Sequence, residues 1–323
     1  MKKFIKYAGL TFLLVAVACL AGEWAARSIL GLGTPPLSIA HPRIEYMFKP
    51  DQDVLRFGHR LLINHYGMRS EPFAARHGKN EFRVMVFGDS VVFGGAQTDQ
   101  ADLATTLLRK KLAAEMGKDV VVGNISAGGW GACHWLAYAQ EYGFFAADVV
   151  ILVISSHDYA DNRTFQPLDK LAQPTEPPVS ALLEGIERYL PRYLPKFLTS
   201  GSETQLETDH FQEPPEPNIE RGLRDLRQFL VLAREHAGQV VVFQHWEQSE
   251  IRQGNARAGN QRIGEICASL NIPTIQLAPY YSQAIQQGEN PYRDNIHLNA
   301  LGQRIMAEAF YDFLTTSPLK GRH

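Results

Sequence analysis

A serine and a histidine that lie far apart in the chain each stand in a setting that suits nucleophilic catalysis. Ser90 closes the tripeptide Gly88-Asp89-Ser90, directly after a short apolar run. His297 lies three residues after Asp294. A serine hydroxyl becomes a nucleophile when a base takes its proton, and that base needs a third group to fix its tautomer. We therefore predict that Asp294 orients His297 and that His297 activates Ser90 for attack on an ester carbonyl.

Each of these residues also has an ordinary structural interpretation. Asp294 is suited to capping the helix expected at residues 300–314, and His297 could be a packed or surface histidine. For Asp294 or His297 taken alone, a structural role is the better interpretation. A catalytic role is favoured because the pair occurs together with Gly-Asp-Ser at the end of a strand.

Strands alternate with helices from residue 82 onward. Short apolar runs predict strands at residues 82–87, 119–125, 148–155, 239–245 and 273–277. Apolar residues at helical spacing predict helices at 98–116, after Gly131, at 220–236, 261–270 and 300–314. This alternation predicts an α/β fold, a three-layer α/β/α sandwich around a parallel sheet of about five strands. Ser90 would then lie at the carboxyl edge of the sheet, where ligands bind in open α/β folds.

A glycine-rich turn follows the second predicted strand at the same edge. Residues 124–131 read Asn-Ile-Ser-Ala-Gly-Gly-Trp-Gly. Acyl transfer develops negative charge on the carbonyl oxygen, and each preorganised donor there is worth ~3–4 kcal/mol. A glycine-rich turn of this kind leaves backbone N–H groups accessible. Glycine could also serve only the geometry of the turn.

These blocks resemble those of the SGNH hydrolase superfamily, also called GDSL esterases and lipases, across residues 82–314. The resemblance implies that Ser90 is the nucleophile and that Asp294 and His297 complete the triad. It also implies that Gly129 donates a backbone N–H to the oxyanion. No metal or organic cofactor is implied.

One block departs from the family pattern. The family carries an asparagine after the third strand that donates to the oxyanion, and His157 stands in its place here. A histidine donates a hydrogen bond only in a suitable tautomer or charge state. The expected oxyanion site is therefore formed by Ser90, Gly129 and His157, with Asn162 as a less well spaced alternative.

Residues 1–30 are expected to form a membrane anchor or signal segment. Three lysines precede an apolar run at residues 7–22, which residues 24–26 extend toward the ~20 residues of a membrane span. The lysines should stay in the cytoplasm. We expect a single-pass inner-membrane helix with the catalytic domain in the periplasm. A signal peptide cleaved after residues 16–18 and lipidation at Cys19 are alternatives, and each also exports the rest of the chain.

Residues 31–81 are expected to be a linker with a small β-hairpin at 53–64. We expect surface or structural roles for His59, His65 and Arg69, although contact with substrate is an alternative for each.

The hydrolase-like domain is expected to span residues 82–316, with an insertion at 159–217 that is rich in proline. Such long loops in compact domains are usually functional or disordered. Residues 179–198 alternate apolar and basic side chains. They could form a cap over the site, a face that rests on the bilayer, or a solvated insertion.

The charge and the cysteine content limit the kinds of partner and cross-link that the chain is expected to have. The net charge is −2 with no basic run, so a nucleic-acid partner is not expected. Cys133 and Cys267 are interpreted as buried thiols, since three cysteines are too few for a disulfide scaffold.

Export and the family resemblance point to an acylated carbohydrate or a small ester as the substrate. Acyl groups of an extracytoplasmic polysaccharide, most plausibly O-acetyl groups, are the expected target. A lipid is an alternative substrate, given the apolar side chains of the insertion. An O-acetyltransferase using the same triad and a non-catalytic glycan-binding or assembly factor are alternative functions. Four aromatic residues near the predicted site edge could stack on sugar rings, although core packing is expected for at least two of them. These are Trp130, Trp135, Tyr159 and Trp246.

Overall fold

Five parallel strands form the centre of the protein. In this computed structural model, which describes residues 2–190 and 214–316, they are β5 (Glu81–Gly88), β6 (Asp119–Ser126), β7 (Val149–Ser155), β8 (Gln239–His245) and β9 (Thr274–Gln276). Their spatial order is β6-β5-β7-β8-β9, and every neighbouring pair is parallel. The predicted α/β class and the five-stranded parallel sheet are confirmed.

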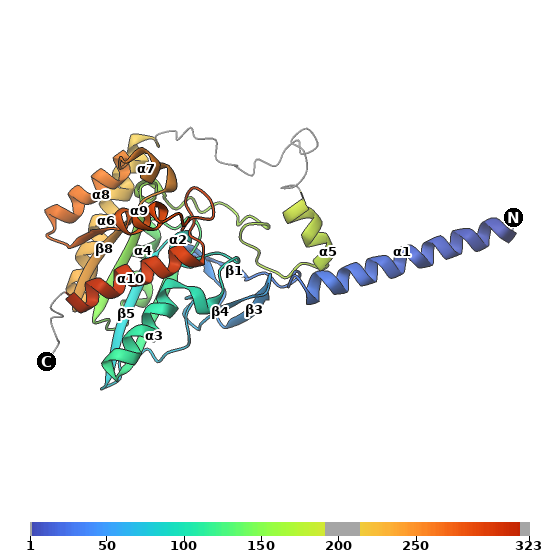
Figure 1. Ribbon diagram of the computed structural model, residues 1–323, viewed down its shortest axis with the longest axis horizontal. Helices are drawn as coiled ribbons and strands as arrows, with labels where there is room; N and C mark the ends of the chain where they lie inside the picture. The colour runs from blue at the N-terminus through green and yellow to red at the C-terminus, as the bar shows by residue number, and fades with distance from the viewer. Residues whose placement is uncertain (1, 191–213, 317–323) are drawn as a thin grey trace.

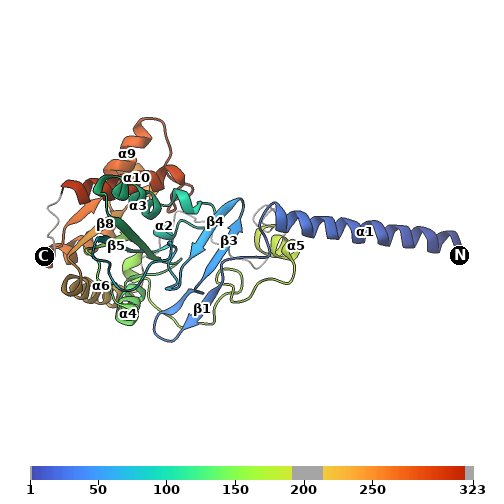
Figure 2. The same ribbon diagram turned by 90° about the horizontal axis from the view of Figure 1, so that it is seen from below.

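Helices cover both faces of this sheet (Figure 2). One face packs against α3 (Ala104–Met116), α9 (Ala278–Gln286) and α10 (Ala300–Thr316), and the other against α4 (Ala132–Tyr142), α6 (Glu216–His236) and α8 (Ala258–Ser269). Successive strand residues alternate between the two cores, as strand geometry requires. Val86 packs toward α3 and α10, and its neighbour Phe87 packs toward α4 and α6. The result is the predicted three-layer sandwich.

The first helix of the sandwich begins later than expected. A short 3₁₀ turn, η1 (Gln100–Asp102), precedes α3, and Leu103 between them has extended backbone. The Asp99 carboxylate accepts a hydrogen bond of 2.8 Å from the Ala101 N–H, which fixes this turn apart from the helix. The helices α7 (Gln248–Gln253) and α9 were not predicted from the sequence.

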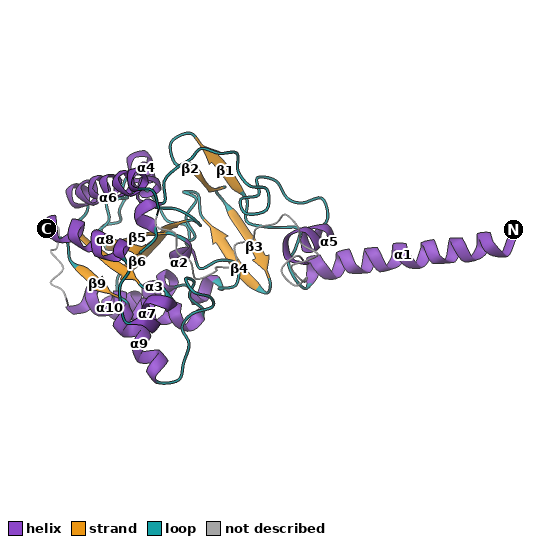
Figure 3. Ribbon diagram, turned by 90° about the horizontal axis from the view of Figure 1, so that it is seen from above, coloured by secondary structure: helices purple, strands orange, loops and turns teal. Residues whose placement is uncertain are grey.

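Two antiparallel hairpins precede the sheet. The first pairs β1 (Ser38–His41) with β2 (Glu45–Phe48), and the second pairs β3 (Gln52–Arg56) with β4 (His59–Ile63). The second is the predicted hairpin, and its turn has positive φ at Phe57 and Gly58. Both hairpins lie between the N-terminal helix and the sheet (Figure 3).

The N-terminal helix α1 (Lys2–Ser28) projects away from the rest of the molecule (Figure 1). Residues Phe4–Ser28 are long and apolar enough to cross a membrane, and a signal sequence would have the same properties. Beside its inner end lies α5 (Ala181–Glu184), which continues as one π-helical turn to Tyr189. The expected alternation at residues 179–198 falls partly on 191–213, which lie outside the described residues.

Candidate active site

The chain turns sharply between β5 and the short helix α2 (Ser90–Phe93), and this turn presents Ser90 at the carboxyl edge of the sheet. Asp89 caps α2, because its carboxylate accepts a hydrogen bond of 2.9 Å from the Val91 N–H. A Cβ at Gly88 would lie only 2.3 Å from the side chain of Val92, so the tight turn requires glycine there. Ser90 itself is half-buried.

The structure brings Ser90, His297 and Asp294 together. His297 Nε2 lies 2.9 Å from Ser90 Oγ, and His297 Nδ1 lies 2.9 Å from Asp294 Oδ2. Burial opposes ionisation of Asp294, but hydrogen bonds from the side chain and backbone of His297 outweigh it and hold the pKa of Asp294 far below its ordinary value. An ionised Asp294 holds the proton on Nδ1, which leaves Nε2 able to accept the serine proton.

A tight loop carries Asp294 and His297. Its two ends pair as an antiparallel bridge between Tyr292 and Leu298, and the Arg293 N–H donates 2.8 Å to the His297 carbonyl. Below the loop, His245 at the end of β8 donates from Nε2 to the Ile296 carbonyl at 2.9 Å. Burial lowers the pKa of His245 to about 4, so this ring is neutral at neutral pH. These contacts fix the loop relative to the sheet.

Gly129 lies in the turn that follows β6. Gly88 and Ser126 are register partners, so this turn begins beside the strand that leads to Ser90. The φ of Gly129 is 72°, a conformation that favours glycine. Gly129 is exposed, and the described residues provide no hydrogen-bond acceptor for its N–H. The preceding Gly128 carbonyl accepts a hydrogen bond from the Tyr46 hydroxyl, which holds the turn in place.

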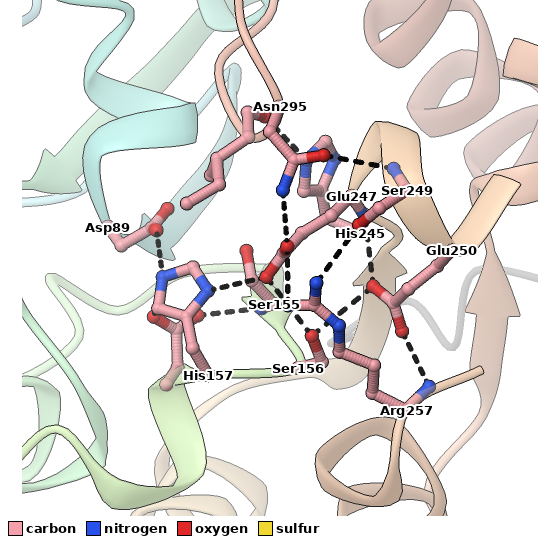
Figure 4. Close-up of polar contacts among 12 residues, drawn as sticks. Asp89, Ser155, Ser156, His157, His245, Glu247, Ser249, Glu250, Arg257 and Asn295 are labelled. Atoms are coloured by element: carbon pink, nitrogen blue, oxygen red, sulfur yellow. Dashed lines mark hydrogen bonds and ion pairs between the residues drawn. The ribbon is translucent and has the colours of Figure 1, made fainter. Parts of the chain in front are cut away.

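His157 lies among three carboxylates (Figure 4). Its Nδ1 is 3.3 Å from Glu247, and its Nε2 is 3.6 Å from Asp89 and 3.4 Å from Asp158. Burial opposes a charged ring, but the attraction of Asp158 and hydrogen bonds to Asp89 and Glu247 raise the pKa of His157 well above its ordinary value. Burial and the charge of Asp89 also raise the pKa of Asp158. These contacts favour the imidazolium form of the ring. Both of its N–H groups are directed at carboxylates, so direct donation to an oxyanion requires the ring to turn.

Asp89, His157 and Asp158 also place three potential metal-ligand atoms within 4.8 Å of one another. Histidine binds a metal ion in its neutral form, so a metal at this place would have to displace the ring proton that the carboxylates favour.

Glu247 connects this cluster to the loop of His297, a role that the sequence analysis missed. Its Oε2 accepts hydrogen bonds of 2.6 Å from Arg257 and 2.8 Å from the Asn295 side chain (Figure 4). Asn295 in turn accepts 3.0 Å from the Ser249 N–H. The available sequence signal was the position of Glu247 directly after a predicted strand, at the same edge of the sheet as Ser90.

Comparison with known proteins identifies the family. The model described as the GDSL-like Lipase/Acylhydrolase family matches residues 86–305. The chain belongs to this family. It is therefore a hydrolase that acts on ester bonds.

Several solved structures resemble this GDSL-family chain. A lipolytic protein of the G-D-S-L family from Veillonella parvula is 13% identical with a TM-score of 0.46, and the match covers 73% of this chain and 100% of that one. A catalytic mutant of an acetylxylan esterase from Geobacillus stearothermophilus is 12% identical with a TM-score of 0.46, covering 77% and 100%. An enzyme from the metagenome of Lake Arreo in Spain is 14% identical with a TM-score of 0.44, covering 74% and 96%. No curated protein matches the chain.

Arg69 stabilises the segment that follows Ser90 in this GDSL-family chain. Its buried guanidinium donates to the carbonyls of Phe93, Gly95 and Thr98 at 2.5, 2.7 and 2.6 Å. Burial lowers the pKa of Arg69 to about 9. Because Phe93 ends the helix that begins at Ser90, Arg69 fixes the segment that follows Ser90, which is a structural role.

The aromatic candidates for sugar stacking are mostly in the core. Trp130, Trp135 and Tyr159 are buried, and Trp246 is partly exposed. The indole N–H of Trp135 donates 2.8 Å to the Gly88 carbonyl and so supports the turn before Ser90.

The two cysteines of the globular part are buried and free, as predicted. Cys133 Sγ lies 3.3 Å from the ring of its neighbour His134.

Proposed function

We propose that this protein is a serine esterase that removes ester-linked O-acetyl groups from an extracytoplasmic polysaccharide. The observation that carries the proposal is the hydrogen-bonded series of Asp294, His297 and Ser90, with 2.9 Å at each link. Nucleophile, base and orienting carboxylate are the parts that acyl transfer through a serine requires.

In the proposed mechanism, His297 Nε2 takes the proton of Ser90 as the hydroxyl oxygen attacks the ester carbonyl. The tetrahedral intermediate collapses, the ester C–O bond breaks, and His297 returns the proton to the leaving alcohol. Water, activated by His297, then hydrolyses the acyl-enzyme. Asp294 stabilises the imidazolium that forms in each half-reaction.

The oxyanion site in this proposal uses the backbone N–H groups of Ser90 and Gly129. The free N–H of Gly129 supports its role. His157 is the third donor in this proposal, and its ring must turn away from Asp89 so that an N–H faces the oxyanion. Because the neighbouring carboxylates offset the charge of the ring, its contribution is a hydrogen bond to the oxyanion.

We further propose that residues 1–30 anchor the protein in the inner membrane and place the catalytic domain, residues 82–316, in the periplasm. Residues 31–81 connect the two. The apolar helix and the lysines at its N-terminal end support this orientation. Residues 159–217 form the insertion within the catalytic domain.

The direct test uses the full chain in detergent micelles with acetylated polysaccharides such as acetylated xylan, and it measures acetate release. We expect release by the wild type and none above background by Ser90→Ala. Loss of acetate release when sugar acceptors compete with water would indicate an O-acetyltransferase. Binding of glycan without acyl release by either protein would overturn the esterase proposal in favour of a glycan-binding factor.

A further inference from the structure

An apolar groove lies where α1 meets the segment of residues 181–190. Its volume is about 830 Å³, and its walls include Gly22, Ala25 and Ala26 of α1 and Leu182, Ile186 and Leu190 of the facing segment. On α1 these positions recur at helical spacing, so they form one stripe along the helix. The volume is within the range of small-molecule sites.

Glu23 fixes the two walls to each other. Its carboxylate accepts hydrogen bonds from Ser180 Oγ at 2.7 Å, from the Ala181 N–H at 3.0 Å and from the Leu182 N–H at 2.9 Å. The start of α5 is therefore capped by α1, and the two helices lie side by side (Figure 1). These hydrogen bonds hold the two walls of the groove in a fixed arrangement.

In the proposed orientation, the groove lies where α1 leaves the bilayer. Glu23 is the first charged residue after Lys6, so the apolar run of α1 ends at the groove. Two of the apolar residues that line the groove remain exposed, Ile29 at 65% and Ile186 at 47%. Exposed apolar side chains gathered around a groove are typical of an interaction site.

A second cavity continues from the groove toward Ser90. It has a volume of about 320 Å³ and shares Gln97 and Tyr189 with the groove. Its walls include Phe93, the last residue of the helix that begins with Ser90, and Gly128, the neighbour of Gly129. The two cavities therefore adjoin at Gln97 and Tyr189, and the second one extends to the end of the helix that begins at Ser90.

The second cavity carries positive charge. Arg56 and Arg188 line it, and both contact the single carboxylate of Glu184, at 2.7 and 3.6 Å. Two guanidinium groups around one carboxylate leave one positive charge between the apolar groove and Ser90. A ligand that fits this order has a hydrocarbon part, then an anionic group, then the ester.

We propose that the groove binds the hydrocarbon part of an anionic membrane lipid that carries the acyl ester, so that the substrate reaches Ser90 from the bilayer. This inference rests on the proposed function and narrows its substrate to an acylated group carried on a lipid. The chemical step is unchanged: the acyl group passes to Ser90, His297 protonates the leaving alcohol, and water releases the acid.

The test compares two esters with the full chain in phospholipid nanodiscs. The probes are p-nitrophenyl laurate, which partitions into the bilayer, and p-nitrophenyl acetate, which stays in water. Ala25→Phe fills the groove, whereas the control Leu20→Phe adds the same side chain at an exposed position of α1. We expect Ala25→Phe to lower the laurate-to-acetate rate ratio about tenfold, and Leu20→Phe to leave it within twofold. An unchanged ratio in Ala25→Phe would overturn the groove as a lipid site.

A binding measurement separates failure of the groove from failure of the esterase. Phosphatidylglycerol with a diazirine in its acyl chain is photolysed in the same nanodiscs, and the cross-linked peptides are mapped. We expect cross-links at Gln97 in the wild type, fewer in Ala25→Phe, and fewer with the equivalent phosphatidylcholine. If neither ester is hydrolysed but these cross-links form, the lipid site stands and the esterase fails. Absence of cross-links at Gln97 would overturn the lipid site whatever the activity.

Discussion

The side-chain amide of Asn295 donates a hydrogen bond of 2.8 Å to the carboxylate of Glu247. The other oxygen of Glu247 lies 3.3 Å from the ring of His157. One carboxylate thus contacts both the loop that carries His297 and the charged ring beside Asp89. Glu247 is therefore expected to position the base and to hold the imidazolium at the same time.

Glu247→Gln should lower kcat for p-nitrophenyl acetate roughly 10- to 100-fold, because small displacements of catalytic groups have effects of this size. The amide keeps the shape of the side chain but removes the charge that His157 and Arg257 face. KM should change little, since Glu247 is not expected to touch the substrate. Gln248→Ala, on the exposed side of the same turn, is the matched control. A Glu247→Gln enzyme with wild-type kcat would refute the positioning role.

Asp294→Asn should reduce kcat by about 10⁴-fold, because an asparagine no longer fixes the histidine tautomer that accepts the serine proton. The negative charge that stabilises the imidazolium is lost as well. The measurement is the steady-state rate with p-nitrophenyl acetate, with Asp53→Asn in the second hairpin as a control that keeps full activity. A loss of less than tenfold would show that Asp294 is not the orienting group.

Stability should depend on pH through His157. Its folded-state pKa is raised by Asp158, Asp89 and Glu247, whereas an unfolded histidine titrates near pH ~6.5. The ion pairs therefore contribute fully below that unfolded pKa and are lost as the pH rises through the folded pKa. The urea midpoint of the wild type should fall as the pH rises across this window, and the midpoint of His157→Gln should fall less. His65→Gln changes an exposed ring, so its urea midpoint should depend on pH as in the wild type. If the midpoint of His157→Gln also falls as in the wild type, His157 is not the source of the pH dependence.

Arg69→Met should destabilise the fold by about 3 kcal/mol, since it leaves two buried carbonyls and one partly buried carbonyl without a donor. Urea unfolding measures the change. Arg60→Met removes an exposed ion pair with Asp53 and should cost at most ~1 kcal/mol. Equal effects of the two substitutions would show that the hydrogen bonds of Arg69 to these three carbonyls do not stabilise the segment that follows Ser90.

The sheet could be predicted because each strand is a short apolar run that is buried on both faces, as residues 149–155 illustrate. The spacing of Asp294 and His297 made their pairing foreseeable, since both lie in one short loop. The position of Ser90 at the carboxyl edge of the sheet could be predicted because it directly follows a predicted strand.

The network around Glu247 could not be predicted, because it joins side chains from four separate segments of the chain. No local pattern marks a glutamate as the partner of a distant histidine and asparagine. The first hairpin was missed for a similar reason, because β1 and β2 have four residues each and are stabilised largely by packing against the rest of the protein. Likewise, the direction of the His157 ring depends on three carboxylates that only the folded chain brings together.

The most direct test of the account is hydrolysis of p-nitrophenyl acetate by the full chain in detergent, comparing the wild type with Ser90→Ala. If Ser90 forms the acyl-enzyme, Ser90→Ala should lose at least ~10³-fold in kcat. Intact-mass analysis of the wild type after rapid quenching should show one acetyl group on Ser90. Equal rates in the two proteins, or an acetyl group on another residue, would contradict the assignment of Ser90 as the nucleophile.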